Sequence, residues 1–199
     1  MKKDTTMETK GILKNIWDEL VKRNELDLLM WLATRNGVLS DYEMRMLACK
    51  FVKETPLLDG GTTFDLLDGT CKKTVELSES YAENLITNKA LAIARNDTGK
   101  VATRLIIDNR QYYLFEASFA AYSAAEEDAY RAIYGAQTYS LRAACRAFSN
   151  RGMEIAKEAH VKILAHRYGN PFEHKTIDFS QLLQDSMIIS LKQLIGKGK

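Results

Sequence analysis

The stretch ASFAAYSAAEEDAYRAIY, residues 117–134, decides the fold class of this chain. Alanine recurs through it on several faces of a helix, at Ala120, Ala121, Ala124, Ala125, Ala129 and Ala132. Small side chains let neighbouring helices approach one another closely. We therefore expect this stretch to belong to a tightly packed helical bundle.

The segments that follow this stretch also have helical spacing. Between 137 and 166, small and apolar residues recur at steps of four and three, at Leu141, Cys145, Phe148, Gly152, Ile155, Ala159, Ile163 and His166. Such a seam is expected when one long helix packs along another. Gly169, Asn170 and Pro171 should end this helix, and the apolar residues from Asp178 onward predict a last amphipathic helix.

Before residue 60, three further helices are predicted. The residues from Gly11 to Val21 trace one apolar face, and a short, largely buried helix at 26–32 should end at Asn36 and Gly37. Ser40 and Glu43 form the pattern of a capping box, which starts a third helix. The two Asp-Gly pairs between 56 and 70 predict the longest loop.

The region 71–115 is less uniform. Helical spacing resumes at Cys71, and a shorter helix around 91–94 should end where Asn96, Asp97, Thr98 and Gly99 break the chain. Residues 101–115 fit either a short β-hairpin or the first half of a helix that continues into 117–136. We favour the helix.

Composition supports an all-α fold for the 199 residues. Only 2 prolines and 11 glycines occur, which is too few turn formers for a sandwich or barrel of many short strands. With 46% hydrophobic and 27% charged residues, the chain has the composition of an ordinary globular protein. We predict a single-domain multi-helix bundle over 1–199, with flexible ends at 1–10 and 196–199.

Cysteine use and the lack of apolar segments indicate the compartment. Cys49, Cys71 and Cys145 are odd in number and have no C-x-x-C spacing, so we expect three core thiols in a reducing compartment. The first ten residues lack the apolar run of a secretory signal, and no stretch approaches the ~20 apolar residues of a membrane helix. We predict a cytoplasmic protein with no membrane partner.

No motif predicts catalytic, cofactor-binding or metal-binding residues. His160, His166 and His174 are close in sequence, but helical metal pairs use a spacing of four and these do not. Asp59, Asp65 and Asp68 are interpreted as turn and capping residues, since an EF-hand would need a different spacing. An enzyme built from these aspartates and the late histidines remains a lesser alternative.

Surface residues in the middle of the chain give the leading functional hypothesis. Tyrosine is concentrated there, and aromatic rings are enriched at protein interfaces, although they are equally common around the rim of a helical core. The candidate partner-binding residues are Tyr112, Tyr113, Tyr130, Tyr134, Arg142 and Arg146. We predict a non-enzymatic protein-binding or accessory module, of the kind that phages and mobile elements encode, whose partner is another protein or a second copy.

A nucleic-acid-associated protein is the alternative. The net charge is only +2, so a nucleic-acid site would need a local basic patch. The predicted helix 137–167 carries six basic residues, Arg142, Arg146, Arg151, Lys157, Lys162 and Arg167. Because Glu154 and Glu158 interrupt them, a solvated face with ion pairs at a spacing of four explains the set more simply.

Four segments of the chain together follow a recognisable order. They are RMLAC at 45–49, TFDLL at 63–67 leading into VELSESYA at 75–82, the middle rich in alanine and tyrosine, and HRYGNPF at 166–172. In this order the chain resembles a family of uncharacterised, alanine-rich bacterial proteins, frequent in planctomycetes, that end their helical region in a G-N-P-F motif. It departs from them in the single cysteine after Leu47 and in the lower alanine content of 101–115. The resemblance implies a helical architecture and no established activity.

Overall fold

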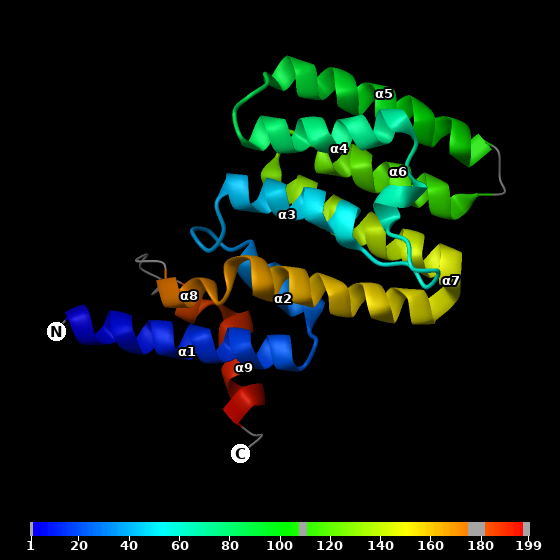
Figure 1. The fold of residues 1–199 in the computed structure, drawn as a ribbon. Coiled ribbons are helices and arrows are strands. Elements are labelled where there is room, and N and C mark those ends of the chain that lie inside the picture. Colours follow the sequence, from blue (N-terminus) through cyan, green and yellow to red (C-terminus); the bar gives the residue numbers. More distant parts are fainter. Residues whose placement is uncertain (1, 108–110, 175–181, 197–199) are drawn as a thin grey trace. The chain divides into compact units, whose positions relative to one another are not determined.

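The computed structural model describes residues 2–107, 111–174 and 182–196, and it confirms the all-α multi-helix bundle. Within these ranges the only strand-like pairing is an isolated bridge between Pro56 and Thr62. The α-helices, drawn in Figure 1, are α1 (Lys2–Lys22), α2 (Leu26–Ala33), α3 (Asp41–Glu54), α4 (Gly69–Ala82), α5 (Asn88–Ile107), α6 (Tyr112–Ala124), α7 (Ala129–Tyr168), α8 (Pro171–His174) and α9 (Ser186–Gly196). Two short 3-10 helices are η1 (Thr63–Leu66) and η2 (Leu182–Gln184).

The chain divides into two compact units. The central unit comprises residues 40–163, and the terminal unit comprises 1–39 together with 164–199. Each unit is described separately below. The expectation of one domain with flexible ends at 1–10 and 196–199 stays a prediction.

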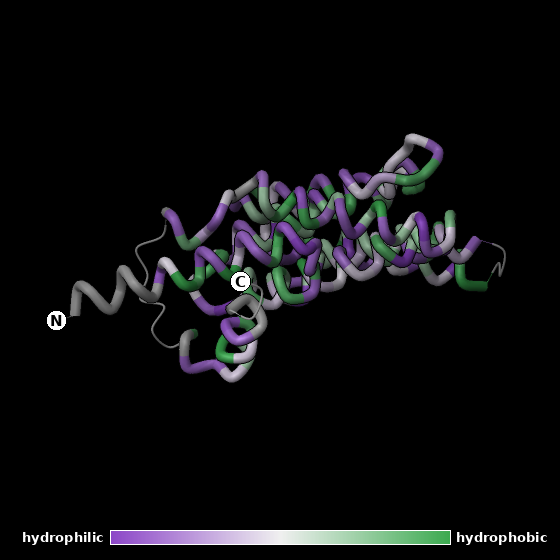
Figure 2. Tube along the Cα trace, turned by 90° about the horizontal axis from the view of Figure 1, so that it is seen from below, coloured by the Kyte–Doolittle hydropathy of each residue, from purple (hydrophilic) through white to green (hydrophobic). Residues whose placement is uncertain are grey.

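In the central unit, α4, α5 and α6 pack against one another, and α3 contacts α4 and α6 (Figure 1). Hydrophobic and hydrophilic residues alternate along these helices, as the buried stripe of a packed helix requires (Figure 2). The alanines of 117–134 lie in the interior; Ala117, Ala120 and Ala121 are fully buried. A Cβ atom added to Gly135 would lie 2.5 Å from the Cβ of Ser123, so α6 and α7 are in close contact. The tight packing predicted for this stretch is confirmed.

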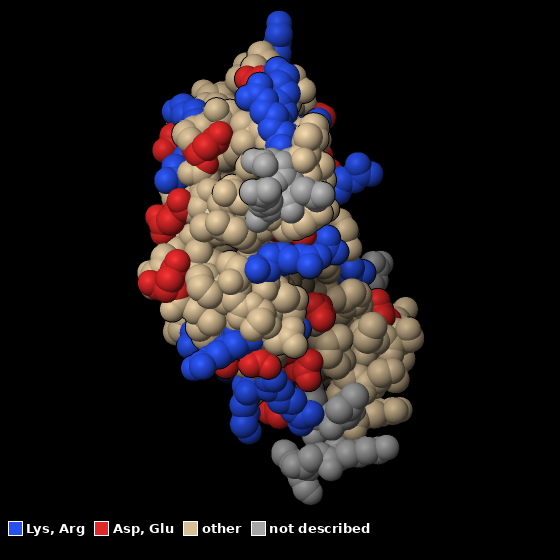
Figure 3. All heavy atoms as spheres, turned by 90° about the vertical axis from the view of Figure 1, so that its right-hand side faces the viewer, with Lys and Arg blue, Asp and Glu red and all other residues tan. Residues whose placement is uncertain are grey.

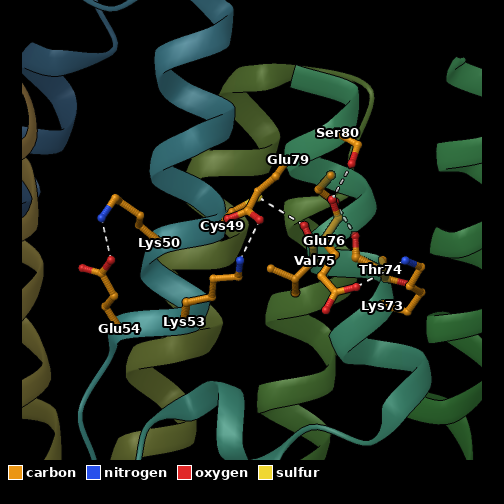
Figure 4. Close-up of polar contacts among 11 residues, drawn as sticks. Cys49, Lys50, Lys53, Glu54, Lys73, Thr74, Val75, Glu76, Glu79 and Ser80 are labelled. Carbon is orange, nitrogen blue, oxygen red and sulfur yellow. Dashed lines mark hydrogen bonds and ion pairs between the residues drawn. The ribbon is translucent and has the colours of Figure 1, made fainter. Parts of the chain in front are cut away.

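Helices α3 and α4 are joined by polar contacts around a buried thiol (Figure 4). The Lys53 ammonium lies 2.6 Å from the Glu79 carboxylate, and the Cys49 thiol donates to the Val75 carbonyl at 3.7 Å. Cys49 and Cys71 are buried as predicted, whereas Cys145 is only half-buried. The prediction of a core thiol was therefore wrong for Cys145.

The predicted turn and capping signals of the N-terminal half are confirmed. The Ser40 hydroxyl accepts from the Glu43 backbone N–H, while the Glu43 carboxylate accepts from the Ser40 backbone N–H at 2.7 Å. Gly37, which ends the turn after α2, has φ of +79°, a conformation that costs glycine little.

The described residues of 101–115 are helical except Gln111, the N-cap of α6, but they belong to two helices. The predicted single helix continuing through 117–136 was wrong, because α6 ends at Ala124. Helix α5 runs to Ile107 and α6 begins at Tyr112, so the hairpin alternative was wrong for 101–107 and 112–115; residues 108–110 lie outside the described part. The break predicted at 96–99 was also wrong, because α5 is continuous through it. Tertiary contacts explain the difference: the buried Thr98 hydroxyl donates to the Thr74 hydroxyl at 2.8 Å, and Gly99 lies against the Tyr122 ring.

The long helix predicted over 137–166 is two helices joined by a sharp break. Phe148 has φ, ψ of −139°, 21° and Ser149 of 63°, −163°, neither of which is helical. A Cβ atom on Gly152 would lie 2.5 Å from the Ala144 carbonyl oxygen, although eight residues of straight helix span about 12 Å. The chain therefore folds back on itself after Phe148, as the ribbon shows (Figure 1).

In the terminal unit, the GNPF segment attaches α8 to α1. The Asn170 amide donates to the Lys14 carbonyl at 3.0 Å and to the Asp18 carboxylate at 2.8 Å, and its carbonyl accepts from the Phe172 backbone N–H. The fully buried Phe172 ring meets Trp17 edge-on at 6.3 Å. This segment does end α7, as predicted, but it also forms tertiary contacts.

The C-terminal part contains η2 and α9, with Ile188 and Leu191 buried. The predicted last helix is thus confirmed from Ser186 onward, while 175–181 lie outside the described residues. Among the helices that the structure describes, none combines the length and apolar character needed to cross a membrane.

Candidate binding surface of the central unit

The six predicted partner-binding residues fall into two groups at opposite ends of α6. Tyr112 starts α6, and the Arg146 guanidinium lies 6.0 Å from its ring. The rings of Tyr130 and Tyr134 pack at a tilt, with centroids 4.6 Å apart, at the start of α7, beyond the other end of α6. Since α6 spans about 18 Å, the six residues do not form one patch.

Apolar side chains are exposed where α5 ends and α6 begins. Ile107 is 76% exposed, Ile106 45% and Tyr112 48%. We call these three residues the α5–α6 tip; the last turn of α5 is coloured as hydrophobic beside the grey trace in Figure 2. Tyr113 is half-buried in the next position. An exposed cluster of large apolar residues is typical of an interaction site.

Arginines flank the tip. Arg142 and Arg146 are exposed on α7, and the Arg142 guanidinium lies 5.3 Å from the Tyr139 ring. In the upper part of Figure 3, several Lys and Arg side chains lie on the face that the view shows, and Asp and Glu side chains lie along one edge. This end of the central unit therefore combines apolar and positively charged surface.

The carboxylate that faces these arginines is buried. Glu116 is 6% exposed, and its Oε2 atom has no hydrogen-bond partner among the residues that the structure describes. Burial raises the pKa of Glu116, and the positive charges of Arg142 and Arg146 only partly oppose that shift. Because burial disfavours its charged form, Glu116 neutralises the two arginines incompletely.

A groove of about 630 Å³ runs between α5 and α6. We call it the α5–α6 groove; its lining residues are Ala92, Arg95, Asn96, Gly99, Lys100, Thr103, Arg104, Phe119 and Tyr122. Small residues of α5 leave the space open, and the rings of α6 form the opposite wall. A smaller hollow of about 280 Å³ shares Ala92 and Arg95 with it.

Three cationic side chains of α5 line the groove. Arg95 pairs with Glu126 at 2.6 Å and its guanidinium lies 5.8 Å from the Tyr122 ring. Lys100 pairs with Asp97 at 2.8 Å in an exposed contact. Arg104 is exposed and forms no ion pair with any residue that the structure describes. The groove therefore retains a net positive charge.

The candidate aspartates act as turn and capping residues, as predicted. The Asp68 carboxylate accepts from the Cys71 backbone N–H at 2.8 Å and begins α4, while Asp65 caps η1 through the Thr62 N–H at 2.8 Å. Asp59 accepts from the Gly61 N–H at 3.1 Å. None of these three aspartates lines the groove or the hollow.

Of the late histidines, His160 alone belongs to the central unit, and it contacts Phe51 and Thr55 rather than an aspartate. His160 is fully buried, stacks on Phe51 at 4.3 Å and lies 2.5 Å from the Thr55 hydroxyl, and burial lowers its pKa to about 3. His166 is exposed in the terminal unit, and the side chain of His174 lies outside the described residues. Among the described side chains, no three metal-ligating residues form a group that could hold an ion.

The buried thiols are poor nucleophiles. Burial raises the pKa of Cys71 to about 12, and it also raises the pKa of Cys49 well above its usual value. Since the thiolate is the reactive form, neither cysteine supports covalent catalysis at neutral pH. An enzyme built from the aspartates and histidines gains no support from this geometry.

The break at Phe148 and Ser149 also changes the nucleic-acid alternative. Arg142 and Arg146 precede the break, whereas Lys157 and Lys162 follow it on the helix that runs back. The expectation of a continuous basic face over 137–167 was therefore wrong. A backbone reversal in a run of good helical spacing was not visible in the sequence.

Sequence reasoning missed two further features of the central unit. Arg45 is 7% exposed and donates to the carbonyls of Glu126 and Glu127, which fixes the turn between α6 and α7. The α5–α6 groove was missed because α5 was predicted to break at 96–99. Had α5 been continued, the spacing of four between Lys100 and Arg104 would have placed these two cations side by side on one helix face.

No protein-family model, curated protein or solved structure matches the chain. The resemblance to alanine-rich bacterial proteins ending in a G-N-P-F motif therefore stays a prediction.

Proposed function

We propose that this protein is a non-enzymatic module that binds a protein partner through the α5–α6 tip. The observation that carries this proposal is the exposure of Ile106, Ile107 and Tyr112, three large apolar side chains at one end of the central unit. Leaving such a cluster in water forgoes roughly 25 cal/mol of stabilisation per Å² of apolar surface, which a partner covering it recovers.

The charges around the tip indicate the chemistry of the partner. Arg146 lies beside Tyr112, and Arg142 is one helical turn away. We infer a partner that presents an apolar side chain flanked by carboxylates, because aromatic and arginine residues are the usual anchors of such interfaces. Free, buried Cys49 and Cys71 support placing this function in the cytoplasm.

The test compares two matched variants. Ile107→Glu places a negative charge at the centre of the tip, and Leu85→Glu makes the same change at an equally exposed residue, 71% against 76%. Leu85 lies just before the N-terminus of α5, whereas Ile107 is the last residue of this helix, which is about 28 Å long. Both variants should fold, because neither side chain is buried.

Tagged wild type and both variants are incubated with lysate of the native host, with and without nuclease, and retained proteins are quantified. The proposal expects one protein, retained in stoichiometric amount after nuclease, that is lost with Ile107→Glu and kept with Leu85→Glu. Sedimentation of the pure protein tests a second copy as partner: a dimer of the 22.6 kDa chain should dissociate in Ile107→Glu. Equal retention of host protein by the wild type and both variants would refute the proposal. So would a result in which none of the three retains a protein and all three sediment as monomers.

A further inference from the structure

We infer that the α5–α6 groove is a binding site for a nucleotide, taken either as a free mononucleotide or as one residue of a single strand. The phosphate would lie against Lys100 and Arg104, and the base against the rings of Phe119 and Tyr122. This site is separate from the tip residues Ile106, Ile107 and Tyr112.

The size of the groove fits this class of ligand. Its volume of about 630 Å³ lies within the range of small-ligand sites, roughly 300–1,000 Å³. The cations from Arg95 to Arg104 extend over about 13 Å of α5. A ligand with an anionic group and a flat ring can contact the cations and the rings at the same time.

The α5 side of the groove carries small residues, and at Gly99 the α5 backbone lies close to the aromatic wall. Between the cations stand Ala92, Gly99 and Thr103. A Cβ atom on Gly99 would lie 3.3 Å from the Tyr122 ring, so even a methyl group there would press on the aromatic wall.

The charges available to a ligand differ along the groove. Arg95 forms a half-buried ion pair with Glu126, and its guanidinium lies over the Tyr122 ring. It therefore helps to form the wall of the groove, while its charge is largely neutralised by Glu126. Lys100 has only an exposed contact with Asp97, which a phosphate can replace at small cost. Arg104 offers its guanidinium for two parallel hydrogen bonds to phosphate oxygens.

The rings favour a nucleotide over an acidic peptide. Phe119 and Tyr122 pack together at 5.1 Å, and Phe119 also contacts Tyr139 at 4.6 Å, so the wall is rigid and aromatic. A basic groove with aromatic side chains is the arrangement by which proteins hold nucleotides of any sequence, whereas a glutamate side chain would use the cations and leave the rings unused.

The test is calorimetric titration of the full chain with adenosine monophosphate, ribose 5-phosphate, adenosine, inorganic phosphate, a short oligodeoxyadenylate and an oligoglutamate peptide. Adenosine monophosphate or the oligonucleotide should bind at least about tenfold more tightly than ribose 5-phosphate and adenosine, because each fragment keeps one of the two contacts. If the mononucleotide binds as tightly per site as the oligonucleotide, the ligand is the free nucleotide. If only the oligonucleotide binds, the ligand is a single strand.

Three exposed substitutions locate the site. Arg104→Glu removes the phosphate contact, and Thr103→Trp fills the groove without changing its charge; both should weaken binding about tenfold or more. Arg131→Glu makes the same charge change outside the groove, on α7, and should leave binding unaltered. Circular dichroism verifies that all three fold.

Several results would overturn the inference. These are no binding by any nucleotide probe, equal binding of adenosine monophosphate and inorganic phosphate, tighter binding of the oligoglutamate peptide, and an effect of Arg131→Glu as large as that of Arg104→Glu.

Discussion

Protonation of His160 should destabilise the central unit in mild acid. The imidazole lies in the interior between α3 and the second half of α7, stacked on Phe51. The Thr55 hydroxyl donates to the Phe51 carbonyl, so the Nε2–H of the neutral ring donates to the Thr55 oxygen. Within the described part of the chain, Nδ1 has no hydrogen-bond partner. A proton added at Nδ1 would place an uncompensated charge in this site.

The magnitude follows from the pKa values of the folded and unfolded chain. Burial lowers the pKa of His160 to about 3, against about 6.5 in an unfolded chain. Because the unfolded chain binds the proton more tightly, this contribution to stability is complete above about pH 6.5 and is lost as the pH falls towards 3. Between about pH 7 and pH 5 the free energy of unfolding should fall by about 2 kcal/mol from this residue.

Urea unfolding followed by circular dichroism at the two pH values measures this loss. His160→Phe keeps the ring stacked on Phe51 and removes the proton site, so its loss over the same range should be smaller by about 2 kcal/mol. His166→Gln, at an exposed histidine, should behave as the wild type. A wild-type loss that persists in His160→Phe would refute the reasoning. So would an NMR titration showing that the His160 ring becomes charged above about pH 5.

Two further predictions concern close contacts. Asn170→Ala should lower the free energy of unfolding of the terminal unit by about 2–3 kcal/mol, because the Lys14 carbonyl and the Phe172 N–H lose their partner; urea unfolding measures this, and a change below about 0.5 kcal/mol would contradict it. Gly152→Ala should lower the free energy of unfolding by about 1–3 kcal/mol, because its methyl group would lie 2.5 Å from a backbone oxygen. Gly11→Ala has nothing within 4 Å of the added methyl group and should be neutral or stabilising by up to about 1 kcal/mol. Thermal melts compare the two variants, and equal effects would show that the turn after Phe148 is loosely packed.

The local signals in the sequence were sufficient for α2, α3 and α4 and for the residues that cap them. Ser40 with Glu43, Asp68 and Gly37 act through residues only a few positions away, so their roles were predicted from spacing alone. The same holds for the alanine-rich stretch 117–134, because small side chains allow close packing whatever the neighbour is.

The candidate surface was predicted only in part. Tyr112 and Arg146 do lie together, but Tyr130 and Tyr134 lie at the far end of α6. The sequence shows that Tyr112, Tyr130 and Tyr134 are close along the chain. It does not show that the length of α6 separates Tyr112 from the other two tyrosines in space. Nothing in the sequence indicated that Ile107 would be exposed, because an isoleucine at the end of a helix can equally well be buried.

The amino-acid sequence was enough to predict the all-α class, the starts of α2, α3 and α4 and their capping residues, because these depend on contacts within one or two helical turns. The tertiary structure alone decided that α5 continues through 96–99, that the chain reverses after Phe148, and that Asn170 joins α8 to α1. The first and the last of these depend on atoms that are distant in sequence: Tyr122 lies against Gly99, and Asn170 bonds to Lys14. Burial and hydrogen bonding at such contacts outweigh local propensity, and only the folded chain brings those atoms together.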